Sequence, residues 1–168
     1  DLVDLRENRH FLLRIAVVGE EKVGRKQGHW LEVEVVPRVG YRQISKMLLT
    51  GPASDPRNVH KLVHRDGAGE LHEVELDAQA EEDEESVERD TAPRREVLGE
   101  EEFPFKDTML SVEHVRIGEG DEAVEVWLNR DVRPMGIVRL SSPEGELVLR
   151  DYGEGGASGE TAIDREYP

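Results

Sequence analysis

Two histidines spaced four residues apart are the first candidates for site chemistry in this chain. His60 and His64 lie in the run His-Lys-Leu-Val-His. On a helix, residues four apart project from the same side, so two imidazoles at this spacing can share a metal ion. A metalloprotease motif requires a glutamate directly after the first histidine, and Lys61 stands there instead. His72 or Glu73 would have to complete a zinc site, so we keep His60 and His64 as candidate metal ligands and predict no metal.

Pairs of glutamates are the second kind of candidate, because two carboxylates that face each other can catalyse hydrolysis. Glu32 and Glu34 alternate along one predicted strand, and Glu113 and Glu125 lie on two others. Alternating polar residues are also the ordinary way in which one face of a sheet stays in contact with water. We therefore predict that Glu32 and Glu34 lie on a solvent-exposed face and that neither pair is catalytic.

Nucleophilic and phosphate-binding motifs are missing from the sequence. Cysteine is absent, and none of the serines stands in the Gly-x-Ser-x-Gly setting of an exposed nucleophile. The glycine-rich runs at residues 118–120 and 153–156 do not precede a predicted helix, and no Gly-Lys-Ser/Thr follows them. These observations predict no catalytic residues and no cofactor, and thus a protein that is not an enzyme.

The charge of the chain limits its partners. Among 168 residues, Asp and Glu number 38 and Lys and Arg 22, which gives a net charge of -16. Such a charge repels nucleic acid and anionic lipid surfaces. No apolar run reaches the roughly 18 residues of a membrane-spanning helix, which predicts no membrane span in the given chain. The chain starts at Asp1 and not at methionine, so we expect that an N-terminal segment, such as a signal peptide or a lipid-bearing cysteine, was removed.

The elements that would position these residues are mostly strands. Residues 10–18 and 29–36 are rich in β-branched residues and are separated by turn-forming glycines, which predicts a long hairpin. Residues 41–50 are predicted as a third strand, although Ile44, Met47 and Leu48 also satisfy helical spacing. Residues 55–65 show the clearest helix pattern, with a Ser54 or Asp55 cap and Pro56 in the first turn. Residues 70–76 are predicted as a further strand.

An acidic insertion divides this part from a second run of strands. It occupies about residues 78–92 and offers almost nothing to bury, which favours an extended loop. Short hairpin turns at residues 118–120 and 143–145 then predict antiparallel pairing of neighbouring strands. The predicted strands of this second half are residues 94–98, 108–117, 121–129, 136–142 and 146–152.

Together these patterns predict a mainly β fold with minor α content. We expect a strongly curved antiparallel sheet or half-barrel with one or two short helices, forming a single domain over residues 1–152. Residues 153–168 are predicted to be a glycine-rich C-terminal tail, because residues 153–159 have the composition of a flexible linker.

Large aromatic residues and methionines are the candidates for ligand contact. Their more ordinary role is packing in the core or at its rim. If they lined a concave sheet face, they would form an adaptable apolar groove. The candidate ligand-binding residues are Trp30, Met47, Trp127 and Met135.

Residues 126–153 carry a family resemblance. They contain Val-Trp-Leu-Asn-Arg-Asp-Val-Arg-Pro-Met-Gly-Ile-Val, then Ser-Ser-Pro-Glu-Gly and Leu-Arg-Asp-Tyr-Gly. These runs resemble bacterial envelope proteins that are similar to the lipoprotein-carrier (LolA-like) architecture. Residues 46–49, 55–59 and 99–114 extend the resemblance, whereas the acidic insertion departs from it. The resemblance implies a curved antiparallel sheet that partly wraps around helices and can hold acyl chains in its hollow.

Two functions remain open at this point. The first is an exported, periplasmic, envelope-associated binding protein, similar to an outer-membrane lipoprotein, that holds an apolar ligand or a partner segment on a concave sheet. The second is an accessory or structural subunit of a larger protein assembly, bound through a strand edge, the acidic loop and the tail.

Overall fold

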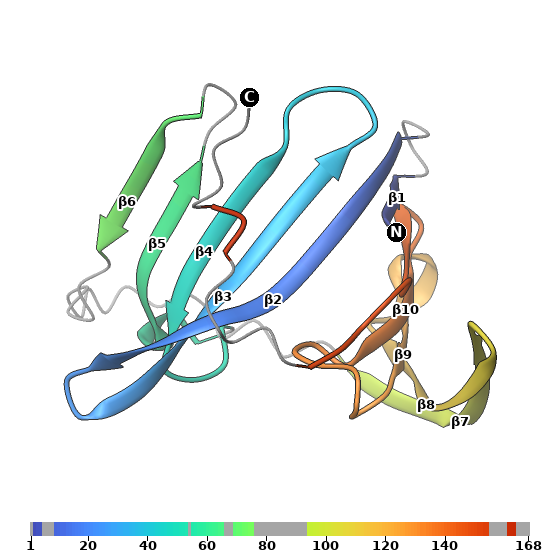
Figure 1. Cartoon of the computed structure of the whole chain (residues 1–168). Coiled ribbons are helices and arrows are strands. Elements are labelled where there is room, and N and C mark those ends of the chain that lie inside the picture. Colours follow the sequence, from blue (N-terminus) through green and yellow to red (C-terminus); the bar gives the residue numbers. More distant parts are fainter. Residues whose placement is uncertain are drawn as a thin grey trace. The chain divides into compact units, whose positions relative to one another are not determined.

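The protein is mainly β and forms two compact units (Figure 1). The computed structural model describes residues 2–4, 9–53, 55–65, 69–75, 94–154 and 161–163. Unit 1 consists of the described residues within 1–11 and 83–154, and unit 2 of those within 12–82 and 155–168. Each unit contains an antiparallel sheet, and neither sheet closes into a barrel. The predicted mainly β, antiparallel fold is confirmed.

Unit 2 is built on one sheet in which each strand pairs with its sequence neighbour. The strand order is β6-β5-β4-β3-β2. The hairpin predicted from residues 10–18 and 29–36 is confirmed, with Gly24 in its turn. The third predicted strand is also a strand and not a helix. The bounds are β2 Arg9–Val23, β3 Lys26–Pro37, β4 Gln43–Leu49, β5 Val59–Arg65 and β6 Leu71–Glu75.

The helix predicted over residues 55–65 is wrong. Asp55 does act as a cap, since its side chain accepts a hydrogen bond from the Arg57 backbone, but the turn that follows is a three-residue 3-10 helix, η1 Pro56–Asn58. From Val59 the chain continues as β5, in which Leu62 pairs with Met47 of β4. Pairing with the neighbouring strand therefore overrides a helical spacing that only a few apolar residues support. The described residues contain no α-helix. It follows that no helix among them is long and apolar enough to cross a membrane.

Strand register separates the two faces of the unit 2 sheet. Leu31, Met47, Leu62 and Val74 are directly opposite one another on β3, β4, β5 and β6, and they form an apolar row on one face. The other face carries Glu32, Glu34 and Ile44, together with charged residues of β5 and β6. Because side chains alternate along a strand, these charged residues share the second face, which we call the polar face, with apolar residues such as Leu48 and Val63.

Unit 1 has the strand order β1-β11-β10-β9-β8-β7, with antiparallel neighbours as predicted. The short β1 also pairs with the first residues of β2. The core of unit 1 contains Val112, Trp127, Val132 and Val138. A 3-10 turn, η2 Gly120–Glu122, precedes β9. The bounds are β1 Leu2–Asp4, β7 Arg95–Phe105, β8 Thr108–Ile117, β9 Val124–Leu128, β10 Ile137–Ser141 and β11 Gly145–Val148.

Two sequence predictions concern residues that are described only in part. The acidic insertion at about residues 78–92 lies outside the described residues. Most of the predicted linker does too, since residues 155–160 are not described. Residues 161–163 are described, and all three are buried in unit 2. This part of the predicted tail therefore belongs to the packed structure of unit 2. Whether residues 1–152 behave as a single domain stays a prediction.

Candidate functional site

The four candidate ligand contacts are divided between the two units. Trp30 and Met47 lie on opposite faces of the unit 2 sheet, because Trp30 pairs with Leu48 and Met47 pairs with Leu31. Trp127 is buried in the core of unit 1. Met135 is 52 % exposed on the turn between β9 and β10. Within unit 2, the structure thus does not bring Trp30 and Met47 together on one surface, and their role as ligand contacts stays a prediction.

Trp30 is engaged by charged neighbours on its own sheet face. Its indole Nε1 donates to Glu21 Oε2 at 3.1 Å, and Lys46 Nζ lies 4.8 Å from the ring centroid. Lys61 Nζ donates to the other oxygen of Glu21 at 3.1 Å. The hydrogen bond from Lys61, together with that from Trp30, lowers the pKa of Glu21. Neighbouring side chains of the sheet therefore contact both the indole N–H and the ring face of Trp30.

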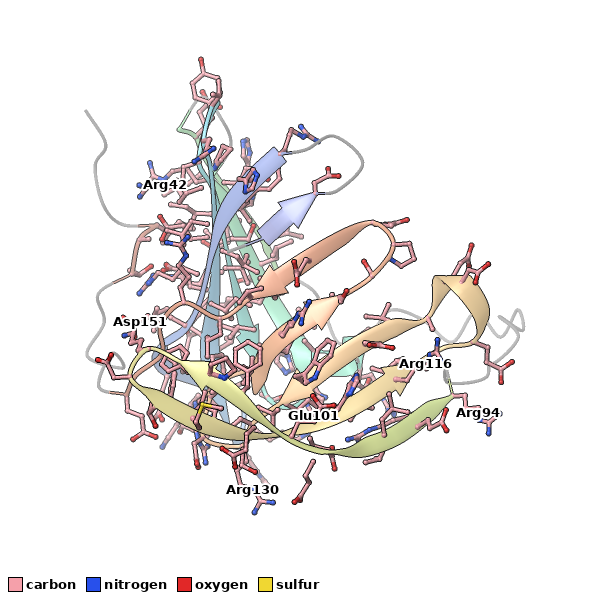
Figure 2. All side chains as sticks on the ribbon, turned by 90° about the vertical axis from the view of Figure 1, so that its right-hand side faces the viewer. Arg42, Arg94, Glu101, Arg116, Arg130 and Asp151 are labelled. Carbon is pink, nitrogen blue, oxygen red and sulfur yellow. The ribbon has the colours of Figure 1, made fainter. Side chains whose placement is uncertain are left out.

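Trp127 stands in a cluster that satisfies its polar groups within unit 1. The His114 ring stacks on it at a centroid distance of 4.2 Å, and the Arg139 guanidinium lies 4.9 Å from its ring. Glu101, in the middle of the β7–β8 hairpin (Figure 2), accepts from Trp127 Nε1 at 3.1 Å and lies 2.8 Å from His114 Nδ1. These hydrogen bonds, that from Trp127 first, lower the pKa of Glu101. Glu125 lies 3.3 Å from His114 Nε2. These contacts satisfy the indole N–H of Trp127 and both ring nitrogens of His114, and the role of Trp127 as a ligand contact stays a prediction.

The candidate metal ligands His60 and His64 lie on β5 and are bonded to hydroxyl groups. His60 Nε2 is 2.8 Å from Thr50 Oγ1, and His64 Nδ1 is 3.0 Å from Ser45 Oγ. Within the part of the chain that the structure describes, no group of three or more His, Asp or Glu side chains is placed to hold a metal ion. The hypothesis of a shared metal assumed that His60 and His64 project from the same side of a helix, but both residues lie in a strand.

The prediction that Glu32 and Glu34 lie on a solvent-exposed face is wrong. Glu32 is 0 % exposed and Glu34 only 7 %. Arg14 Nη1 donates to Glu32 Oε1 at 2.8 Å and lies 3.8 Å from Glu34, and Arg42 Nη1 lies 2.7 Å from the other oxygen of Glu34. Two arginines thus balance two buried carboxylates. Glu113 and Glu125 form no pair, because the register places them on opposite faces of the unit 1 sheet.

The other groups that bury Glu32 come from residues 161–163, which we call the docked segment. Thr161 Oγ1 donates a hydrogen bond to Glu32 Oε2. The backbone N–H of Ala162 donates to Oε1 at 3.0 Å, and that of Ile163 to Oε2 at 3.3 Å. Figure 1 shows this segment in red against the face of the sheet. A single carboxylate therefore holds two successive backbone amides and a hydroxyl of a segment about 130 residues away in sequence.

Two opposing effects determine the ionisation of Glu32. Burial favours the neutral acid and would raise the pKa. The hydrogen bonds from Thr161, Ala162, Ile163 and Arg14 favour the carboxylate, and together they outweigh burial, so the pKa of Glu32 is lowered from its ordinary value. Glu32 is therefore a carboxylate at neutral pH, and it accepts charge-assisted hydrogen bonds, which are stronger than neutral ones.

The rest of the contact is apolar, with one further charged group. Ala162 and Ile163 pack with Ile44, and Val63 packs against the same cluster. Arg65 Nη2 donates to the carbonyl oxygen of Ile163, and Nη1 donates to Gly69 O at 3.1 Å. Arg65 Nε is buried, and among the described residues it has no hydrogen-bond partner. We call Arg14, Glu32, Ile44, Val63 and Arg65 the Glu32 site.

Sequence reasoning misses this site because its two halves are far apart in the chain. The one local signal is Thr-Ala-Ile, a triplet with two β-branched residues that follows the glycine-rich stretch after a single glutamate. No protein-family model, curated protein or solved structure matches this chain.

Proposed function

We propose that the protein is a binding protein that holds a short polypeptide segment on the polar face of the unit 2 sheet, at the Glu32 site. The observation that carries this proposal is the fully buried Glu32 carboxylate, which accepts hydrogen bonds from two successive backbone N–H groups and one hydroxyl. Backbone groups are common to all peptides, so a site that binds them can accept a segment of another chain. In this structure the occupant is the protein's own docked segment.

The docked segment sets a bound on the affinity for a separate peptide. A short flexible connection of the kind predicted for residues 153–159 gives a tethered segment an effective concentration of roughly 1 mM. A segment that is docked most of the time must therefore have a dissociation constant below about 1 mM. The contact is small, so we expect a dissociation constant between about 10 µM and 1 mM for the free peptide.

A full-length variant with a released segment allows a direct test. In Ala162→Asp/Ile163→Asp, two carboxylates would have to be buried beside Glu32, and undocking avoids this cost. A fluorescent peptide with the sequence of residues 159–168 is titrated into this variant and followed by anisotropy. We expect saturable binding, and we expect binding to be at least about tenfold weaker when Glu32→Gln is added, because charged acceptors contribute most to such contacts.

The control for that titration is Glu21→Gln in the same released variant. Glu21 also accepts two side-chain hydrogen bonds on the same sheet face, and the donors are Trp30 and Lys61 instead of the docked segment. Peptide affinity should be unchanged. Absence of saturable binding up to several millimolar, or equal binding with and without Glu32→Gln, would contradict the proposal.

The apolar row on the opposite sheet face favours a second candidate function, the binding of an apolar ligand. Leu31, Met47 and Leu62 are only partly buried, and Val74 is 48 % exposed. Four apolar side chains in register across four strands offer a continuous strip to an acyl chain. Lipid extraction of natively purified protein followed by mass spectrometry tests this, and the absence of a stoichiometric lipid argues against it.

A subunit role in a larger assembly would use the edge of the same sheet. All five residues of β6 are exposed, and in the described residues no strand pairs with its outer side. Such an edge can accept a strand from a partner. Size-exclusion chromatography and native purification test this role, and a compact monomer without a partner would argue against it.

We further propose an exported, periplasmic location in the bacterial envelope. Its support is the resemblance of residues 126–153 to envelope proteins. Fractionation of the source cells should place the protein in the envelope or periplasm, and recovery from the cytosol would contradict this location.

A further inference from the structure

Arg65 has a donor that the docked segment leaves unused. Nη2 binds the carbonyl oxygen of Ile163 and Nη1 binds that of Gly69, while the buried Nε has no acceptor within the part of the chain that the structure describes. Nε and Nη2 point to the same side of a guanidinium group, and together they match the two oxygens of a carboxylate. Ile163 is followed by further residues, so its carbonyl offers one oxygen where the guanidinium could bind two.

On the basis of the peptide site proposed above, we propose that the preferred ligand is a free C-terminus, with its last residue in the position of Ile163. Its carboxylate pairs side-on with Nε and Nη2 of Arg65. A buried donor without an acceptor is destabilising, and a chain end satisfies it whereas an internal residue does not. The docked segment is then an imperfect tethered substitute that a better chain end displaces.

The contacts of the docked segment also define the side chains of this ligand. Thr161 donates its hydroxyl proton to Glu32, which requires Ser or Thr two residues before the end. Ala162 is 0 % exposed, so a small residue is needed in the middle. Ile163, 1 % exposed, packs with Ile44 and Val63, which favours an aliphatic last residue. The ligand class is a chain ending in Ser/Thr, a small residue and an aliphatic residue with a free carboxylate.

The charges around the site are compatible with a ligand carboxylate. The negative charge of Glu32 is balanced by Arg14 and by backbone N–H groups, and that of Glu34 by Arg42. The carboxylate of the ligand extends the carbonyl of its last residue, which faces Arg65, while the N–H of the same residue faces Glu32. The two ends of the last residue thus meet opposite charges.

The test uses the full-length Ala162→Asp/Ile163→Asp variant and three labelled peptides. Two have the sequence Gly-Glu-Thr-Ala-Ile, one with a free C-terminal acid and one with a C-terminal amide. The third has the sequence of residues 159–168. We expect the free acid to bind about tenfold or more tightly than the amide and than the longer peptide. Adding Arg65→Gln should make the acid and the amide bind equally, since it removes both the charge and the paired donors.

The outcomes separate this inference from the proposed function. If none of the three peptides binds, the peptide site itself is wrong. If the peptides bind but the amide or the longer peptide equals the acid, the site is correct and the preference for a chain end is wrong. If the acid is preferred but Arg65→Gln leaves that preference intact, the pairing of the ligand carboxylate with Arg65 is wrong.

Discussion

Replacing Glu32 by glutamine tests the site by changing one atom type. The glutamine oxygen can take the place of Oε1 and keep the hydrogen bonds from Ala162 and Arg14. Its NH2 group then takes the place of Oε2, which in the native protein accepts from Thr161 and Ile163. The Thr161 hydroxyl can rotate and accept, but the backbone N–H of Ile163 then faces another donor.

The magnitude follows from that geometry. A buried N–H without its acceptor costs about 1–3 kcal/mol, and hydrogen bonds to a charged acceptor contribute about 1.5–3 kcal/mol each, so several contacts weaken together. Ile163 N–H retains a second acceptor, Thr161 Oγ1 at 3.3 Å. We therefore expect the free energy of docking to fall by about 2 kcal/mol, which is near the lower end of the range that these contributions allow. This corresponds to about a 30-fold change in the undocking equilibrium of the segment.

Hydrogen exchange of the Ala162 and Ile163 amides measures this equilibrium directly. In Glu32→Gln both amides should exchange about 30-fold faster, while the amides of β3 and β4 outside the contact keep their protection. Glu21→Gln is the matched control, since it changes the same residue type on the same sheet face, and it should leave both amides unchanged. Slow exchange of both amides in Glu32→Gln would refute the argument that this carboxylate holds the segment.

Three further predictions concern pH, packing and the independence of the units. Because the pKa of Glu32 is lowered from the ordinary 4.5, the stabilising effect of its carboxylate is complete above pH 4.5 and is lost as the pH falls through the lowered pKa. Docking of residues 161–163, followed by NMR, should therefore persist to about pH 5 and weaken only in stronger acid. Loss of docking above about pH 5 would contradict this prediction. Gly28→Ala should destabilise the protein by about 1–3 kcal/mol in urea unfolding, because the new Cβ would lie 2.9 Å from Leu48 Cδ1. Gly153→Ala is the control, since its Cβ meets nothing within 4 Å and should have no effect. Equal unfolding midpoints for the two variants would show that the argument about Gly28 is wrong. His114→Ala removes the ring that stacks on Trp127, so it should shift tryptophan fluorescence and destabilise unit 1 by about 1–3 kcal/mol. Hydrogen exchange of the amides in the docked segment should not change, and faster exchange there would show that the two units are coupled.

Much of the fold can be predicted from alternation alone. The strands around residues 10–18, 29–36 and 108–117 are predictable because β-branched residues alternate between turn signals. The boundaries are less accurate, since β7 runs to Phe105 although the pattern predicts only residues 94–98. The helix prediction at residues 55–65 fails because Val59, Leu62 and Val63 fit the helical period. Pairing with β4 nevertheless makes the segment a strand, with Leu62 and Val63 on opposite faces.

The candidate site is harder to predict for a different physical reason. A strand with Glu at alternate positions predicts a face in contact with water, and that inference holds only if nothing covers the face. Glu32 is covered by residues 161–163, and no local pattern connects β3 with a segment so distant in sequence. The aromatic residues are visible in the sequence, but their side chains are engaged by neighbouring polar groups such as Glu21 and Glu101.

The most direct test of the central claim is an intermolecular nuclear Overhauser effect in the Ala162→Asp/Ile163→Asp variant. A peptide ending in Thr-Ala-Ile is added with its alanine methyl group labelled. We predict a cross-peak from that methyl group to the side chain of Ile44, which belongs to the same buried cluster as Ala162 in the intact protein. A peptide that shows no contact with Ile44, or that contacts it equally after Glu32→Gln, would contradict the claim that this carboxylate places a peptide on the sheet.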